Sequence, residues 1–362
     1  MANLARTVIR DSLRAKADEA IIIQAGAHTV DLATQVALEA FKVGADPAIL
    51  YESDETFFGQ FKLLTEDQLR KTSAHCLGIA DYVQSYVWMG GVENPAPMRR
   101  VPKAKWAAMF EGEEAHYRKN LEKKQKQVNV ALGAVTRDRA KTYGFNFAKW
   151  RRMVMEAIAT DYRAIRRTGQ VLSGLLQREA EVRVRADNGT DLRFRLAGET
   201  RVPFLDDGII GDEDLSIGNT TTSLPAGAVY VAPIEDSAQG TVVSDVRIPQ
   251  VGTLIEGLAW TFRDGRVVDF TAKRNLASAQ LNYVEGTGAK DMFGAFGLGL
   301  NKKVVPGYLD TFYARGTVSI GIGDNRSFGG ANTSSYGFNA FNSHATVTID
   351  GKPIVEEGRL VA

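Results

Sequence analysis

The first half of the chain alternates between short apolar runs and segments in which apolar residues recur at the helical period. Ala20–Ala25 is an apolar run rich in β-branched residues that ends at Gly26, which is typical of a buried strand. Thr29–Val43 follows the helical period, and Pro47–Tyr51 and Tyr82–Met89 have the composition of further strands. Strands and helices that alternate in this order predict a parallel α/β sheet.

Helices are predicted for most of the remaining sequence before residue 180. Met1–Asp18 is an amphipathic first helix, and Thr65–Cys76 is a helix that opens with a threonine cap and a glutamine three residues later. A charged helix, Trp106–Gln127, leads into the strand Val128–Val135. A long helical region, 147–177, then links the two parts of the chain, with a break expected at residues 168–169 because a glycine costs about 1 kcal/mol inside a helix.

The apolar period changes to two close to residue 180. Val182–Leu196 alternates apolar residues with arginines and turns at Asn188–Gly189, which predicts a hairpin. Leu258–Val268 and Thr346–Leu360 are further hairpins, and one helix is expected over Leu276–Phe293. The fold class is therefore α/β, with a Rossmann-like parallel-sheet domain over residues 1–179 and a mixed, mainly β domain over residues 180–362.

Composition excludes several classes of function. The 362 residues carry a net charge of +1 with both signs mixed along the chain, which gives no basis for binding nucleic acid or an anionic membrane. No apolar stretch approaches the ~20 residues of a membrane span. The single cysteine, Cys76, fits a reducing compartment, so we expect a cytoplasmic protein. No G-x-G-x-x-G follows the first strand, so no dinucleotide cofactor is expected.

Four glycine-rich segments in the second half carry a resemblance to a known family. They read PAGAVYVAP from Pro225, GAFGLGLN from Gly294, GTVSIGIGDN from Gly316 and GGANTSSYGFN from Gly329. Their order and spacing resemble the thermophilic-type metallo-aminopeptidases, the family of aminopeptidase T and aminopeptidase S. The resemblance implies a second domain of the aminopeptidase T type, peptidase-like chemistry and a homodimer.

The same resemblance indicates which residues stand where this family holds its metal. The five ligand positions of the family fall on Ala228, Ala295, Ser319, Gly337 and Asn339. Alanine and glycine have no side-chain donor, and serine and asparagine offer neutral oxygens where carboxylate or imidazole is needed. The resemblance therefore predicts a vacated metal site and no cofactor.

The side chains that remain around these positions suggest other chemistry. As candidate catalytic residues we take Glu235, Ser319 and Tyr336: a carboxylate for acid–base work, or a salt-bridged turn with Asp236, a hydroxyl, and a phenol. As candidate substrate-binding residues we take Asn325, Arg326 and Asn339, because amides and a guanidinium fork suit a carboxylate or amide group.

Three functions stay open at this point. The first is a metal-independent hydrolase or lyase that acts on, or a protein that binds, a small amino-acid-like or peptide-like compound. The second is a non-catalytic binding or assembly protein. The third is a metal-dependent aminopeptidase with a rebuilt site that uses His344 together with Glu235 or Asp310.

Overall fold

The computed structural model describes residues 2–281, 283–284 and 286–362, and it divides into two compact units. The first unit comprises residues 1–158 and 208–225, and the second comprises residues 159–207 and 226–362. The sequence placed one boundary, at residue 179. In these two units the helix before that point belongs to the second, and the chain returns to the first for residues 208–225. No helix among the described residues is long and apolar enough to cross a membrane.

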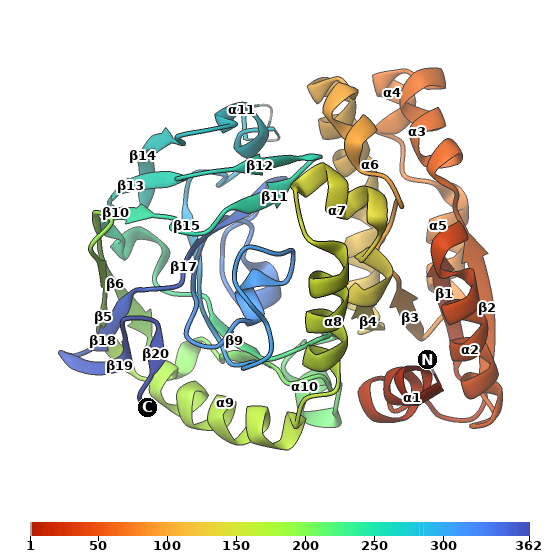
Figure 1. Cartoon of the computed structure of the whole chain (residues 1–362), viewed down its shortest axis with the longest axis horizontal. Coiled ribbons are helices and arrows are strands. Elements are labelled where there is room, and N and C mark those ends of the chain that lie inside the picture. Colours follow the sequence, from red (N-terminus) through yellow and green to blue (C-terminus); the bar gives the residue numbers. More distant parts are fainter. Residues whose placement is uncertain (1, 282, 285) are drawn as a thin grey trace. The chain divides into compact units, whose positions relative to one another are not determined.

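A five-stranded parallel sheet forms the centre of the first unit (Figure 1). Its strands, in spatial order, are β2 (Asp46–Tyr51), β1 (Ala20–Ala25), β3 (Ser85–Trp88), β4 (Lys126–Val130) and β8 (Thr221–Leu224). Every neighbouring pair is parallel. The α/β prediction is thereby confirmed, and β8 is the strand that the returning segment supplies.

Helices surround this sheet much as the hydrophobic periods predicted. The first unit contains α1 (Ala2–Arg6), α2 (Val30–Phe41), α3 (Asp54–Leu63), α4 (Glu66–Leu69), α5 (Ala74–Tyr82), α6 (Lys103–Glu122), α7 (Arg137–Tyr143), α8 (Phe147–Ile158) and α10 (Asp212–Ser216). The predicted first helix continues beyond α1 as a π-helical turn, Thr7–Ser12, which buries Val8 and Ile9. α6 ends before the charged run that precedes β4, so β4 begins and ends earlier than expected.

The helix predicted over Thr65–Cys76 is wrong in extent. Thr65 does cap α4, where its hydroxyl accepts a hydrogen bond from the Gln68 amide at 3.3 Å and the Gln68 side chain accepts one from the Thr65 amide at 2.8 Å. The helix then stops at Leu69, and α5 begins only at Ala74. The local capping signal was therefore correct, although it starts a helix of a single turn.

The long helical region also breaks at a different place from the one predicted. α8 ends at Ile158 and α9 (Tyr162–Leu176) begins after Asp161, whose carboxylate accepts hydrogen bonds from the Arg163 and Ala164 amides. Gly169 lies inside α9, where a β-carbon would fall 2.3 Å from a methyl carbon of Leu205. The glycine is thus a close-packing position and not a helix break.

Two antiparallel sheets pack face to face in the second unit. The larger contains β14 (Arg266–Thr271), β13 (Ala259–Arg263), β10 (Gln239–Val243), β6 (Thr190–Ala197), β5 (Glu179–Ala186), β18 (Thr346–Ile349), β19 (Lys352–Glu356) and β20 (Arg359–Leu360). The smaller contains β17 (Gly337–Asn342), β16 (Val318–Gly323), β15 (Phe293–Gly299), β9 (Ala228–Val231) and β7 (Phe204–Asp206). The short pair β11 (Ile248–Gln250) and β12 (Thr253–Ile255) lies apart from both sheets in strand pairing. The hairpins predicted at β5–β6, β13–β14 and β18–β19 are confirmed.

The hydrophobic core of this unit lies between the two sheets. Phe194 of β6 meets Phe293 and Phe296 of β15 with ring centroids 4.9 and 5.1 Å apart. Only α11 (Leu276–Ala279) forms where a helix was expected over Leu276–Phe293, which is wrong for its second half. Gly288 there has a φ of 75° and lies against the Thr333 carbonyl, a conformation that a helix does not accommodate. Asn282 and Glu285, within that expected helix, lie outside the described residues.

Candidate functional site

The five positions that the family resemblance assigns to metal ligands share one face of the smaller sheet. In its register Ala228 lies opposite Gly299, and Ser319 lies opposite Gly297. Directly opposite residues, and residues two apart on a strand, point to the same face. The same rule places Ala295, Gly321, Asn339 and Gly337 on this face, because Ala295 pairs with Gly321, Gly321 with Asn339 and Gly323 with Gly337. We call this surface the glycine-rich face.

The opposite face of the same strands is part of the core. Its residues are Val229, Val231, Phe296, Leu298, Val318, Ile320, Ile322 and Ala340, all buried. The strands therefore alternate large apolar residues toward the core with small residues on the glycine-rich face. Side chains from neighbouring strands and loops occupy the space above the small residues of this face. A larger residue would not fit there, which explains why the segments are rich in glycine.

Tyr230 covers the middle of the glycine-rich face. It pairs with Gly297 across β9 and β15, and a β-carbon on Gly297 would fall 2.4 Å from two carbons of the Tyr230 ring. Ser319 pairs with Gly297 from the other side and is buried. Burial and the nearby Asp206 carboxylate raise the pKa of the Tyr230 phenol, and the Ser319 hydroxyl opposes part of that rise. The phenol therefore stays protonated and can donate a hydrogen bond.

Two phenylalanines complete the cover beside Tyr230. The Phe328 ring stacks on the Tyr230 ring with centroids 5.4 Å apart, and the Phe204 ring meets Phe328 edge-on at 5.8 Å. Phe204 belongs to the edge strand β7, and Phe328 follows β16 in a short 3₁₀ turn. No local pattern singles out these aromatic residues, because they become neighbours only through the pairing of β7 with β9.

Asp206 is a second functional candidate that sequence reasoning missed. It pairs with Ala228 across β7 and β9, so its side chain lies on the glycine-rich face beside a predicted ligand position. Its carboxylate is buried and accepts a hydrogen bond of 2.7 Å from the Tyr313 hydroxyl. The sequence contains no signal for this contact, because Asp206 and Tyr313 are far apart along the chain.

Glu235 is held by several hydrogen bonds. Arg201 donates to its two oxygens at 2.9 and 3.2 Å, and Asn325 and the Ala331 amide donate to Oε1 at 3.1 and 2.9 Å. Burial alone would raise the pKa of Glu235, but the Ala331 amide, Arg201 and Asn325 together bring that pKa below its ordinary value. The arrangement favours the salt-bridged alternative over a free general base.

Asn325 and Arg326 are also committed to local structure. Asn325 is fully buried, donates to the Gly294 carbonyl at 3.0 Å and accepts from the Asn332 amide at 2.8 Å. Arg326 pairs with Asp324 at 2.7 Å. The structure thus brings Glu235 and Asn325 together as predicted neighbours, but in a network that fixes the loop after β16.

Tyr336 and Asn339 lie on opposite sides of their strand segment. Tyr336 is buried in the core cluster, its ring packs against Tyr283 at 5.3 Å and its hydroxyl donates to the Ala279 carbonyl at 2.8 Å. Asn339 is exposed on the glycine-rich face, and its Oδ1 lies 2.7 Å from the place of a β-carbon on Gly321. Of the six candidate site residues, Ser319 and Asn339 are the two that the register places on that face.

The evolutionary relationship follows from comparison with known proteins. A model of the thermophilic metalloprotease (M29) family matches residues 1–305. The chain belongs to the M29 family. The resemblance inferred from the glycine-rich segments is thereby confirmed. The matched region ends before Gly316, so it includes the strands that carry Ala228 and Ala295 and stops before those that carry the other three positions.

Two solved structures share the fold of this M29 protein. Wild-type AmpT from Thermus thermophilus is 21% identical with a TM-score of 0.78, over 100% of this chain and 98% of that one. The 2,5-dihydroxypyridine dioxygenase from Pseudomonas putida KT2440 is 14% identical with a TM-score of 0.61, over 100% and 96%. The match to AmpT confirms the α/β fold class and the aminopeptidase T type of fold. No curated protein sequence matches the chain.

The donor set on the glycine-rich face does not fit the divalent metal of an M29 peptidase. Ala228, Ala295 and Gly337 have no donor atom, and Ser319 and Asn339 are neutral. Across the described ranges, no three His, Cys, Asp or Glu residues are placed to hold an ion together. Asp206 is the carboxylate that the register places beside Ala228.

His344 does not join Glu235 or Asp310. Its Nδ1 lies 2.9 Å from Oδ2 of Asp245, and the imidazole side chain is 80% exposed. Asp310 is buried, which raises its pKa to about 7. The structure therefore gives no support to the rebuilt site that was proposed from sequence around His344.

Proposed function

We propose that this M29-family protein works without the family's metal and binds a small amino-acid-like or peptide-like compound on the glycine-rich face. One observation carries the proposal: the five positions converge on one face, and none of them is His, Asp, Glu or Cys. A peptidase of this type needs the metal to acidify a water molecule and polarise the scissile carbonyl. Peptide hydrolysis by the family's chemistry is therefore not expected.

The groups that remain on the face suit recognition of a polar, uncharged or anionic group. Tyr230, with its raised pKa, offers a phenol O–H, and Asn339 offers an exposed amide. Phe204 and Phe328 provide apolar surface beside Tyr230. A carboxylate or amide can accept from the polar groups while its side chain packs on the rings. This combination favours an amino-acid-like ligand.

Two measurements test the proposal. Elemental analysis of protein purified without chelator should find no stoichiometric zinc, cobalt, manganese or iron. A thermal-shift screen with amino acids and dipeptides should find a ligand, since a ligand at 100 times its Kd stabilises by about 2.7 kcal/mol. Asn339→Ala should weaken that shift, whereas Asn188→Ala, in the β5–β6 turn of the larger sheet, should leave it intact. A stoichiometric metal, or release of amino acids that stops with chelator, would overturn the proposal.

A non-catalytic assembly role is the second candidate, and an exposed apolar surface favours it. β2 is an edge strand, and its consecutive residues Ile49, Leu50 and Tyr51 are 39%, 40% and 55% exposed. Val30, Leu38 and Phe41 of the neighbouring α2 are exposed as well. Edge strands with bare apolar side chains and unpaired backbone groups readily pair with another strand. We propose that the occupant is a second copy of this chain, as a homodimer.

The oligomeric state tests this second proposal. Light scattering after size exclusion should give a dimer for the wild-type chain, and Leu50→Lys should shift it toward monomer. Leu63→Lys is the matched control, because Leu63 is 84% exposed at the end of α3, away from β2 in sequence. A monomeric wild type, or a dimer that Leu50→Lys leaves unchanged, would exclude this surface as the dimer interface.

We also propose a cytoplasmic location, because Cys76 is unpaired.

A further inference from the structure

A charged pocket of about 690 Å³ opens at the amino ends of the parallel strands in the first unit. Glu19 precedes β1, Gln84 precedes β3 and Gln125 precedes β4, and all three line the pocket together with residues 210–215, which precede β8. Ligands of open α/β sheets ordinarily bind at the carboxyl ends of the strands. This pocket therefore lies at the opposite end of the sheet from the place where such sites are expected. It is also separate from the glycine-rich face, which belongs to the other unit.

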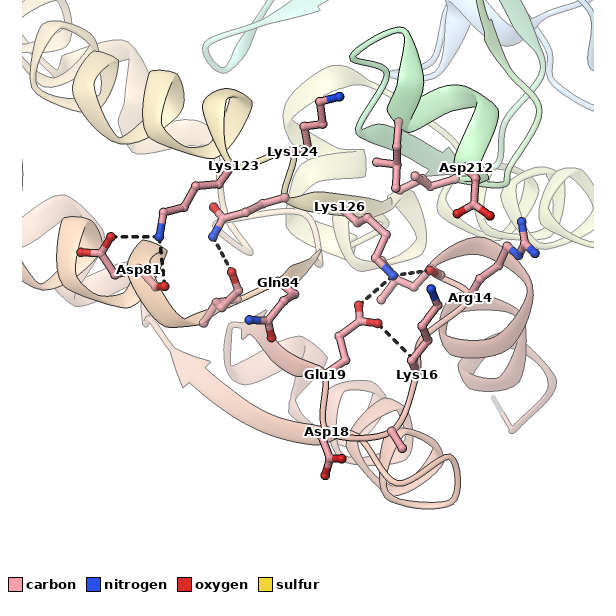
Figure 2. A pocket seen from close by; sticks show the side chains of 16 residues that line it. Arg14, Lys16, Asp18, Glu19, Asp81, Gln84, Lys123, Lys124, Lys126 and Asp212 are labelled. Carbon is pink, nitrogen blue, oxygen red and sulfur yellow. Dashed lines mark hydrogen bonds and ion pairs between the residues drawn. The ribbon is translucent and has the colours of Figure 1, made fainter.

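Two of the lysines in the pocket are held by carboxylates. Lys126 donates to Glu19 at 2.8 Å and to the Leu13 carbonyl at 2.7 Å, and Lys123 pairs with Asp81 at 2.9 Å (Figure 2). An ammonium group has three donors, so Lys126 keeps one N–H beyond these two contacts. Lys126 is also the most buried of these cations, with 13% of its side chain exposed. It is a fixed positive charge in the wall of the pocket.

Other cations in the pocket have no carboxylate partner. Arg14, Lys16 and Lys124 line it and form no ion pair with the residues that the structure describes. Figure 2 shows Arg14, Lys16 and Lys126 on the same side, with Asp212 beside them, whereas Lys124 and Asp18 point away in opposite directions. Three cations from two separate segments thus lie near two acids, Asp212 and Glu19, and Glu19 is already paired with Lys126.

A buried acceptor in the same wall lacks a donor. Gln125 is 4% exposed, and its amide nitrogen donates to the Ala80 carbonyl at 2.8 Å and to the Val83 carbonyl. These two carbonyls fix the orientation of the amide, since the opposite orientation would place oxygen against oxygen. Its Oε1 then has no hydrogen-bond partner among the described residues. A buried acceptor without a donor destabilises the folded state.

The backbone around the pocket is strained. Eight non-glycine residues in the described ranges have a positive φ, and three of them, Arg14, Asp18 and Lys124, line this pocket. A residue with a β-carbon is strained in this left-handed conformation. Strain of this kind collects at ligand sites, where the surrounding structure maintains it.

From these observations we propose that this pocket is a binding site for a small phosphate-bearing compound that also carries a hydroxyl or amino group. The phosphate would accept from the Arg14 guanidinium, the Lys16 ammonium and the third N–H of Lys126. The hydroxyl or amino group would donate to the Asp212 carboxylate. The site is separate from the proposed function of the glycine-rich face and does not depend on it.

Calorimetry on the full chain at fixed ionic strength tests this site with three probes: glycerol 3-phosphate, inorganic phosphate and acetate. We expect glycerol 3-phosphate to bind more tightly than inorganic phosphate, and acetate not to bind. Arg14→Gln and Lys16→Gln should each raise the Kd for both phosphates by about tenfold or more. Asp212→Ala, which removes the acceptor, should abolish the preference for the ester while it leaves inorganic phosphate bound.

Matched variants separate a site from general charge. Arg151→Gln and Lys149→Gln remove exposed cations from α8, outside the pocket, and should leave both Kd values unchanged. The proposal is overturned if neither phosphate binds the wild-type chain. It is also overturned if the control variants weaken binding as much as Arg14→Gln and Lys16→Gln do, because the attraction would then be that of the net charge alone. Circular dichroism of each variant confirms that a loss of binding is not a loss of folding.

Discussion

The Tyr230 ring occupies the space above Gly297, where a β-carbon would fall 2.4 Å from two of its carbons. Gly297→Ala should therefore destabilise the protein by about 1–3 kcal/mol through overpacking. In a Tyr230→Ala background the same substitution should cost much less, because the ring is gone. Urea unfolding of the four proteins in this double-mutant cycle measures the coupling. Equal costs in both backgrounds would mean that the ring does not restrict position 297.

Two glycines in α9 form a matched pair for a second prediction. A β-carbon on Gly169 would fall 2.3 Å from Leu205, whereas one on Gly174 would meet nothing within 4 Å. Gly174→Ala should stabilise the protein by about 0.5–1 kcal/mol through helix propensity. Gly169→Ala should lose that gain and destabilise, and Leu205→Ala should relieve the clash. Thermal unfolding compares the variants, and equal stabilisation by both alanines would contradict the packing at Leu205.

Glu235 should make stability depend on pH in the acidic range. The pKa of its carboxyl is lowered in the folded protein, so its contribution is fully present above the unfolded value of about 4.3 and is lost as pH falls through the folded pKa. Glu235→Gln should cost about 1–3 kcal/mol at pH 7, and the difference from wild type should shrink below pH 4. Denaturant titrations at several pH values give this difference. A cost that is constant with pH would show that the charge is not responsible.

Asp310 should produce the opposite dependence at higher pH. Burial raises its pKa to about 7, so the folded state holds a proton that the unfolded state loses near pH 4. The wild-type protein should therefore lose stability relative to Asp310→Asn as pH rises from 4 to 7. The loss should be on the order of 1 kcal/mol for each pH unit in that window. Parallel stability curves for the two proteins would contradict a buried, protonated Asp310.

Sequence reasoning succeeded where the signal was local and failed where partners are distant. Hairpins that turn at Asn188–Gly189 and Asp350–Gly351 form as expected, because turn chemistry and a period of two act over a few residues. Gly169 was misread as a break, since nothing near it in sequence reveals Leu205. The helix expected up to Phe293 fails for the same reason, because Gly288 lies against Thr333.

The candidate site shows the same division. The alignment of glycine-rich segments correctly pointed to strands that lie next to one another, and the register then placed all five positions on one face. Tyr336 was selected because of its place in a motif, but strand alternation turns it into the core. Asp206 and Tyr230 were overlooked, because their proximity depends on the pairing of β7 with β9 and β9 with β15.

The strand β8 has a consequence for the order in which the chain can fold during synthesis. The parallel sheet takes its last strand from residues 221–224, after the ribosome has already made α9 and the β5–β6 hairpin. Until β8 is synthesised, β4 is therefore an unpaired edge strand of the nascent first unit, while the start of the second unit leaves the ribosome. A fragment that stops at residue 158 would keep that edge bare and available for pairing with another chain, which is a hazard for aggregation.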